Sequence, residues 1–146
     1  MSRKLAREAA FKALFQLDFN YEDDKREYYQ DLAIDMAIDT TDESMYEDNR
    51  LSEKYLPFLK DLVKGTRAHL EEIDALITAN LKQGWQLARI MAADRNILRL
   101  AVYEMKFVEP TIAKGIAINE AVELAKRYGT DDSSRFVNGI LESISK

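Results

Sequence analysis

Apolar residues recur every three or four positions along most of the chain, the spacing that places them on one face of an α-helix. The first such segment predicts a helix over residues 3–19, and the second predicts a helix over 26–38. The apolar side of the second segment consists of Tyr29, Leu32, Ala33, Met36 and Ala37. Residues 39–50 are polar and predict a solvated loop. Residues 53–82 give a longer helical pattern, which Gly65 is expected to divide into two helices.

The next part of the chain predicts a turn followed by two helices. Gly84 marks the turn, and Asp94 has the position of an N-cap for a helix that Pro110 ends. A further helix is predicted over 116–128, with Gly129 as the residue that follows its end.

The last segment predicts a helix that begins after Asp131 or Asp132, and either side chain would serve as its N-cap. Its apolar stripe consists of Val137, Ile140, Leu141 and Ile144. Gly139 lies inside this helix, where glycine costs about 1 kcal/mol relative to alanine. Two explanations stay open: close packing against another helix, or the close approach of a ligand. The chain as a whole predicts six or seven helices, no strand, and an all-α bundle.

Composition narrows the class of protein. The 146 residues suit one domain, and the low numbers of glycine (5) and proline (2) disfavour an all-β fold. There is no cysteine, and His69 is the single histidine. No nucleotide-binding glycine loop, HExxH motif or EF-hand occurs, so we predict no enzyme, cofactor or metal site. No run of about 18 apolar residues and no signal peptide occurs, which predicts a cytoplasmic protein without membrane contact.

The acidity of the chain is concentrated in one segment. The formal net charge is -5, but residues 18–50 alone carry twelve acids against three bases. Residues 2–17 carry four bases against one acid. The overall acidity therefore does not argue against an anionic partner.

Basic and aromatic residues occur together near both ends of the chain. Arg3, Lys4 and Arg7 form a small basic group, and Tyr128 and Phe136 alternate with late cations that include Lys126 and Arg135. Such a mixture suits single-stranded nucleic acid, because cations contact phosphates while unstacked bases lie on aromatic rings. Aromatic residues at helical spacing also occur in ordinary cores, so composition alone leaves both interpretations open.

Four segments together resemble the NusB family of bacterial transcription antitermination factors. They are "RxxAxxALFQ" near the start, "DRNILRLAVYEM" in the middle, and "AINEAVELAKRYG" and "SSRFVNGIL" near the end. The resemblance implies an all-helical fold of about seven helices in two subdomains, with residues 1–146 forming one RNA-binding domain. It also implies no catalysis and no cofactor.

The resemblance implies two direct partners. The first is the ribosomal protein NusE, and the second is single-stranded boxA RNA in nascent ribosomal RNA transcripts. RNA polymerase and the other Nus factors would be indirect partners. An acid that faces NusE in the family corresponds to Asp94, whose role is therefore expected to be partner binding.

The resemblance also carries RNA-binding roles to individual residues. The basic N-terminus implies phosphate contacts, two aromatic positions lie near RNA in the family, and an acidic position lies at the RNA-facing turn. Together with the late cations, the predicted RNA-binding residues are Arg3, Lys4, Arg7, Lys126, Tyr128, Asp132, Arg135 and Phe136. The basic N-terminus is shorter than in some members, so we expect RNA affinity to depend on NusE.

Two alternatives remain. The chain could be a helical protein-interaction module that keeps the fold without binding RNA. A similar helical domain also precedes the catalytic domain of some ribosomal RNA cytosine methyltransferases. This chain ends at Lys146 and has no glycine-rich cofactor loop, so we do not expect it to be such an enzyme.

Overall fold

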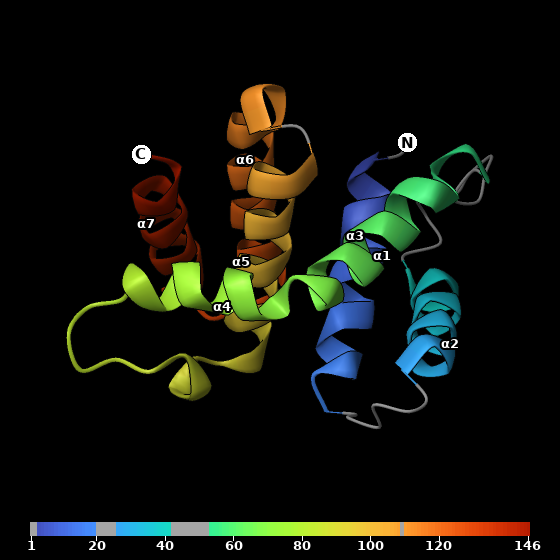
Figure 1. The fold of residues 1–146 in the computed structure, drawn as a ribbon, viewed down its shortest axis with the longest axis horizontal. Coiled ribbons are helices and arrows are strands. Elements are labelled where there is room, and N and C mark those ends of the chain that lie inside the picture. Colours follow the sequence, from blue (N-terminus) through green and yellow to red (C-terminus); the bar gives the residue numbers. More distant parts are fainter. Residues whose placement is uncertain (1–2, 20–25, 42–52, 109) are drawn as a thin grey trace. The chain divides into compact units, whose positions relative to one another are not determined.

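The computed structural model describes residues 3–19, 26–41, 53–108 and 110–146 (Figure 1). Within these ranges the chain forms seven α-helices, three short helical turns and no strand, which confirms the all-α prediction. The α-helices are α1 (Arg3–Leu17), α2 (Arg26–Thr40), α3 (Leu56–Ala68), α4 (Leu70–Ala79), α5 (Ala92–Tyr103), α6 (Pro110–Tyr128) and α7 (Ser133–Ser145). The short turns are η3 (Glu53–Tyr55), η4 (Leu87–Arg89) and η5 (Glu104–Val108). None of the described helices is both long and apolar enough to cross a membrane.

The chain divides into two compact units, residues 1–65 and 66–146, and the boundary falls inside α3. Two units agree with the two subdomains that the resemblance implies. That residues 1–146 act as one RNA-binding domain stays a prediction.

The first unit is built on the packing of α1 against α2. Four alanines of α1 are fully buried, namely Ala6, Ala9, Ala10 and Ala13. Their small side chains allow a neighbouring helix to approach closely. Lys64 of α3 also joins α2, because its ammonium lies 2.9 Å from Asp31 Oδ1 and 3.3 Å from Glu27 Oε1. These two carboxylates raise the pKa of Lys64, with the hydrogen bond to Asp31 as the largest cause.

The predicted apolar side of α2 is partly wrong. Leu32 and Met36 are 40% and 46% exposed, whereas Ala33, Ile34 and Ala37 are buried. The helix is therefore rotated so that Ala33, Ile34 and Ala37 meet the core and Leu32 and Met36 face outward. The loop predicted over residues 39–50 begins later than expected, since α2 extends to Thr40, and residues 42–50 lie outside the described part of the chain.

The second unit places α5, α6 and α7 side by side, and α4 packs against α5 and α7 (Figure 1). The predicted apolar stripe of α7 is buried, as expected. The guanidinium of Arg99 binds Asp74 through two hydrogen bonds of 2.8 and 2.9 Å, which joins α5 to α4. His69 lies between α3 and α4, and its ring stacks on the Phe107 ring of η5 with the two centroids 4.2 Å apart.

Several predicted boundaries are wrong. The break between α3 and α4 falls at His69 and not at Gly65, which lies inside α3. The helical segment before Pro110 ends at Val108, as expected, but Pro110 itself begins α6, since proline is well tolerated at the first position of a helix. That helix therefore begins six residues before Ile116. The predicted end of α6 is confirmed, since the helix ends at Tyr128 and Gly129 follows it.

The prediction that Asp94 caps α5 is also wrong. The helix begins at Ala92, with Met91 in the N-cap position, and the backbone N–H of Arg95 donates to the Met91 carbonyl at 2.9 Å. Asp94 is therefore the third residue of the helix. A carboxylate in the first turn still interacts favourably with the helix dipole.

Candidate nucleic-acid interface

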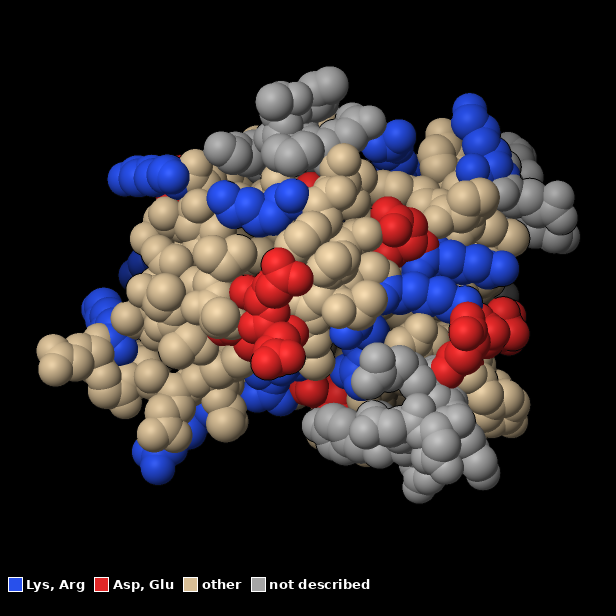
Figure 2. All heavy atoms as spheres, in the orientation of Figure 1, with Lys and Arg blue, Asp and Glu red and all other residues tan. Residues whose placement is uncertain are grey.

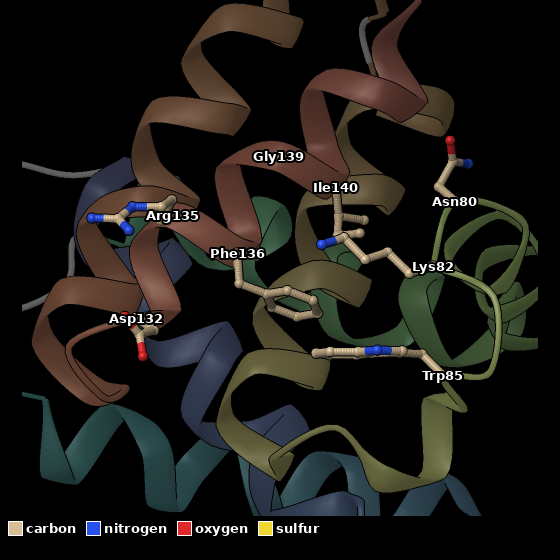
Figure 3. Close-up of a pocket in the computed structure, with 8 residues that line it drawn as sticks. All are labelled: Asn80, Lys82, Trp85, Asp132, Arg135, Phe136, Gly139 and Ile140. Atoms are coloured by element: carbon tan, nitrogen blue, oxygen red, sulfur yellow. The ribbon is translucent and has the colours of Figure 1, made fainter.

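A cavity of about 540 Å³ lies in the second unit, between the start of α7 and the segment that follows α4 (Figure 3). It is lined by Asn80, Lys82, Trp85, Asp132, Arg135, Phe136, Gly139 and Ile140. Figure 3 shows Asp132 and Arg135 on one side of the Phe136 ring and Asn80 and Lys82 on the other. The cavity therefore combines aromatic surface with both signs of charge.

Two aromatic rings form the apolar part of this cavity. The rings of Trp85 and Phe136 are stacked, with centroids 5.7 Å apart and an angle of 26° between their planes. Trp85 follows the predicted turn, which is confirmed: Gly84 has φ +91°, and the backbone N–H of Trp85 donates to the Lys82 carbonyl at 3.0 Å. Phe136 covers part of the indole, yet Trp85 remains 54% exposed.

The charged side chains of the cavity are available for a ligand. In the described part of the chain, neither Lys82 nor Arg135 forms an ion pair, and both are exposed. Asp132 occupies the N-cap position of α7, as predicted, but its side chain makes no capping hydrogen bond. The Ser133 hydroxyl instead accepts a hydrogen bond of 2.9 Å from the backbone N–H of Thr130. The Asp132 carboxylate thus stays at the rim of the cavity.

A hydrogen bond fixes the two walls of the cavity. The Ser143 hydroxyl of α7 donates to Asn80 Oδ1 at 2.6 Å. The amide nitrogen of Asn80 donates in turn to the Leu76 carbonyl of α4 at 2.9 Å. The end of α4, and with it the turn that carries Lys82 and Trp85, is held against α7.

The structure distinguishes between the two explanations for Gly139, which were close helix packing and the approach of a ligand. Its position is exposed, and an added Cβ would have no neighbour within 4 Å, so close helix packing does not explain this glycine. It lines the cavity one turn after Phe136. The approach of a ligand remains as an explanation and stays a prediction.

The other two late candidates, Lys126 and Tyr128, do not line this cavity. Lys126 is exposed near the end of α6. Tyr128 is half-buried, and the guanidinium of Arg127 lies 5.5 Å from its ring centroid. The structure therefore brings together Asp132, Arg135 and Phe136 from the predicted set.

The N-terminal basic residues belong to the first unit. Arg3 and Lys4 are exposed, whereas Arg7 is only 6% exposed. The guanidinium groups of Arg3 and Arg7 lie 4.9 and 5.5 Å from the centroid of the Phe58 ring. These distances permit cation–π interactions between α1 and Phe58 of α3.

Basic side chains are distributed over both units. Figure 2 shows that, on the viewed face of each unit, lysine and arginine lie in small separate groups beside uncharged surface. The described residues contain no group of three or more His, Asp or Glu side chains arranged as a metal site.

Asp94, the candidate for partner binding, is only 7% exposed. Its Oδ1 is buried and has no hydrogen-bond partner within the described residues. A buried acceptor without a donor costs free energy, commonly about 1–3 kcal/mol.

Sequence reasoning did not identify Trp85, Lys82 or Asn80 as part of the site. The segment "KQGWQ" was interpreted only as a turn. One signal in the sequence could have identified Trp85. It is the single tryptophan of the chain and lies in a polar turn, where the burial that is usual for tryptophan is not expected.

The fold and the cavity define a class: a small all-helical protein of two units, with exposed aromatic and basic side chains suited to nucleic acid. The chain belongs to the NusB family, whose family model matches residues 4–146. It is 45% identical over 144 residues to the transcription antitermination protein NusB of Symbiobacterium thermophilum, covering 99% of this chain and 89% of that protein.

Solved structures agree with this assignment. The NusB structure from T. maritima matches with a TM-score of 0.79 and 36% sequence identity, covering 99% of this chain and 91% of that one. A structure of the antitermination factors NusB and NusE in complex with dsRNA matches with a TM-score of 0.78 and 29% identity, covering 98% of this chain and 95% of that one.

Proposed function

We propose that this protein is a non-catalytic, cytoplasmic transcription antitermination factor that pairs with NusE and binds single-stranded boxA RNA of nascent ribosomal RNA transcripts. In this role it would promote the processivity of RNA polymerase together with other Nus factors. The observation that carries the proposal is the Trp85–Phe136 stack beside two cations that lack ion-pair partners in the described chain. The family assignment and the matching complex that contains NusE and RNA support it.

The RNA-binding surface that we propose has two parts. In the second unit, Phe136 supplies a ring, while Arg135 and Lys126 supply exposed positive charge. In the first unit, Arg3 and Lys4 supply exposed positive charge for the phosphates. Arg7 and Tyr128 are more buried. Arg7 lies over the Phe58 ring and Tyr128 lies against the guanidinium of Arg127, and in this proposal both also contact the RNA.

Single-stranded RNA fits this surface better than a duplex. A base can lie on an aromatic ring only when it is unstacked from its neighbours, and a duplex keeps its bases stacked. The Asp132 carboxylate repels phosphate, so we expect it to face the edge of a base, where an amino group can donate a hydrogen bond.

For the partner NusE, we propose that Asp94 accepts a hydrogen bond from a donor of that protein. Its buried Oδ1 lacks a partner in the described chain, and a charge-assisted hydrogen bond would satisfy it. The position of Asp94 at the first turn of α5 places this contact outside the cavity.

The proposal is tested by titrating labelled single-stranded boxA RNA with the protein, with and without NusE, at two salt concentrations. Binding should be tighter with NusE and should weaken with salt, with a slope of about −0.7 per phosphate contact. A scrambled single strand and a boxA duplex serve as controls. Absence of RNA binding in the presence of bound NusE would instead favour a protein-interaction module without RNA.

A further inference from the structure

We propose that the indole of Trp85 is a nucleobase-binding surface, on which a base of single-stranded RNA stacks within the cavity of the second unit. This inference rests on the proposed RNA-binding function and adds to it a residue and a binding mode. Trp85 stands outside the four segments that carry the family resemblance.

The exposure of Trp85 is the first argument. Its residue area is 54% exposed, although tryptophan is a residue that proteins generally bury. The ring is also held in place: it stacks on Phe136, and the turn at Gly84 fixes the backbone that carries it. A large, exposed ring with a fixed orientation requires little ordering when a planar ligand binds.

The surroundings of the indole are the second argument, because they identify the ligand. Lys82 and Arg135 line the same cavity and, among the described residues, have no carboxylate partner. Two such cations beside a ring suit an anionic ligand with aromatic groups, which is the chemistry of a nucleotide strand. An apolar peptide would leave both charges unused, so the observations favour the nucleic acid.

The small size of Gly139 is the third argument. The cavity at this point is open, since an added Cβ would meet no atom within 4 Å. Glycine inside a helix lowers helix stability, so its use here is explained by access to the wall between Phe136 and Ile140. A base that stacks on Trp85 would bring its sugar toward this wall.

The experiment uses Trp85 as its own probe, because it is the only tryptophan in the chain. Single-stranded boxA RNA is titrated into the protein with NusE, and tryptophan emission and the anisotropy of labelled RNA are followed together. Stacking should quench the emission over the same RNA concentrations that raise the anisotropy. The complex with Trp85→Phe gives the emission of NusE, which is subtracted.

Substitution completes the test. Trp85→Ala should weaken RNA binding by roughly 5- to 150-fold, the range measured for the loss of one base–aromatic stack, while Trp85→Phe should retain most of the affinity. Ile116→Ala is the matched control, because Ile116 is 48% exposed in the same unit and does not line the cavity. The boxA duplex should leave the emission unchanged.

The outcomes separate the two proposals. RNA binding by the wild type with unchanged emission and an unaffected Trp85→Ala variant would overturn the base-stacking inference and leave the proposed function intact. Absence of RNA binding by the wild type would overturn both. If Trp85→Ala does not fold, the emission titration of the wild type decides, since unchanged emission on RNA binding, or equal quenching by the duplex, would contradict base stacking.

Discussion

Ser143 of α7 donates a hydrogen bond of 2.6 Å to the amide oxygen of Asn80 at the end of α4. The two residues are 63 positions apart in the sequence. This bond joins the helix that carries Arg135 and Phe136 to the turn that carries Lys82 and Trp85. The geometry of the candidate RNA site therefore depends on a polar contact outside its aromatic pair.

Ser143→Ala should lower RNA affinity more than it lowers stability. The lost hydrogen bond contributes about 0.5–1.5 kcal/mol to folding, and an exposed bond lies at the lower end of that range. Freed from α7, the end of α4 would hold Trp85 less firmly against Phe136. The measurements are thermal unfolding and RNA anisotropy. Ser145→Ala is the control, because its hydroxyl bonds to the Glu142 carbonyl inside α7.

The basic residues of α1 should separate into two kinds by substitution. Arg3→Glu should weaken RNA binding and change the free energy of unfolding by less than about 0.5 kcal/mol, since Arg3 is exposed. Arg7→Glu should destabilise the protein by about 1 kcal/mol or more, because Arg7 is 6% exposed and packs over Phe58. Equal unfolding free energies of the two variants would contradict a structural role for the buried Arg7.

Lys64 gives a prediction about pH and the packing of the first unit. The carboxylates of Asp31 and Glu27 raise its pKa above 10.5, so the folded state holds the proton more tightly than the unfolded state. The resulting stabilisation is fully present below the unfolded pKa and is lost as the pH rises through the raised folded pKa. We expect a small contribution, because the Lys64 side chain is 33% exposed and solvent screens the pair.

The measurement for Lys64 compares the unfolding free energy of the wild type with that of Lys64→Met from neutral to strongly alkaline pH. The difference between them should shrink only at the alkaline end. Lys60→Met, at an exposed position in the same helix, serves as the control. If the difference in unfolding free energy between the wild type and Lys64→Met stays constant across this pH range, the ion pairs of Lys64 are not its source.

The sequence predicted the helices well because each has its own apolar period, as in α7. It did not predict the rotation of α2, since both Ala33 and the larger Leu32 fit an apolar stripe and only tertiary packing distinguishes them. The break after α3 was also missed. Gly65 was a local signal for a helix end, yet the helix continued to Ala68.

The candidate site was predicted only in part, for a similar reason. Asp132, Arg135 and Phe136 lie within about one turn of α7, so helical spacing alone groups them. Trp85 and Lys82 come from a segment about fifty residues earlier and reach the site through the packing of α4 against α7. No local pattern encodes that contact.

Substitution of Asp94 should weaken the binding of NusE without lowering the stability of the protein. Asp94→Asn removes a buried charge whose Oδ1 has no donor in the described chain, so the unfolding free energy should stay unchanged or rise. If NusE supplies the missing donor, its affinity should fall by about 1 kcal/mol, because the amide oxygen of asparagine accepts a weaker hydrogen bond than a carboxylate does. Calorimetric titration of NusE measures this effect. Asp131→Asn, at an exposed carboxylate, is the control, and an equal loss there would refute a specific role for Asp94.

Two glycines of the second unit should respond to alanine in opposite directions. At Gly139 an added Cβ meets nothing within 4 Å, so Gly139→Ala should stabilise the helix by up to about 1 kcal/mol. At Gly129 the Cβ would lie 2.9 Å from the Ala125 carbonyl oxygen and overlap the Ser133 side chain, so Gly129→Ala should destabilise the protein.

The stabilised Gly139→Ala variant is informative about function. If RNA approaches α7 at this point, the added methyl group should weaken RNA binding although the protein unfolds at a higher temperature. Weakened binding cannot then be attributed to a loss of fold. Unfolding and RNA anisotropy, measured on the same preparation, test this expectation. A variant that is more stable and binds RNA as tightly as the wild type would place the strand away from Gly139.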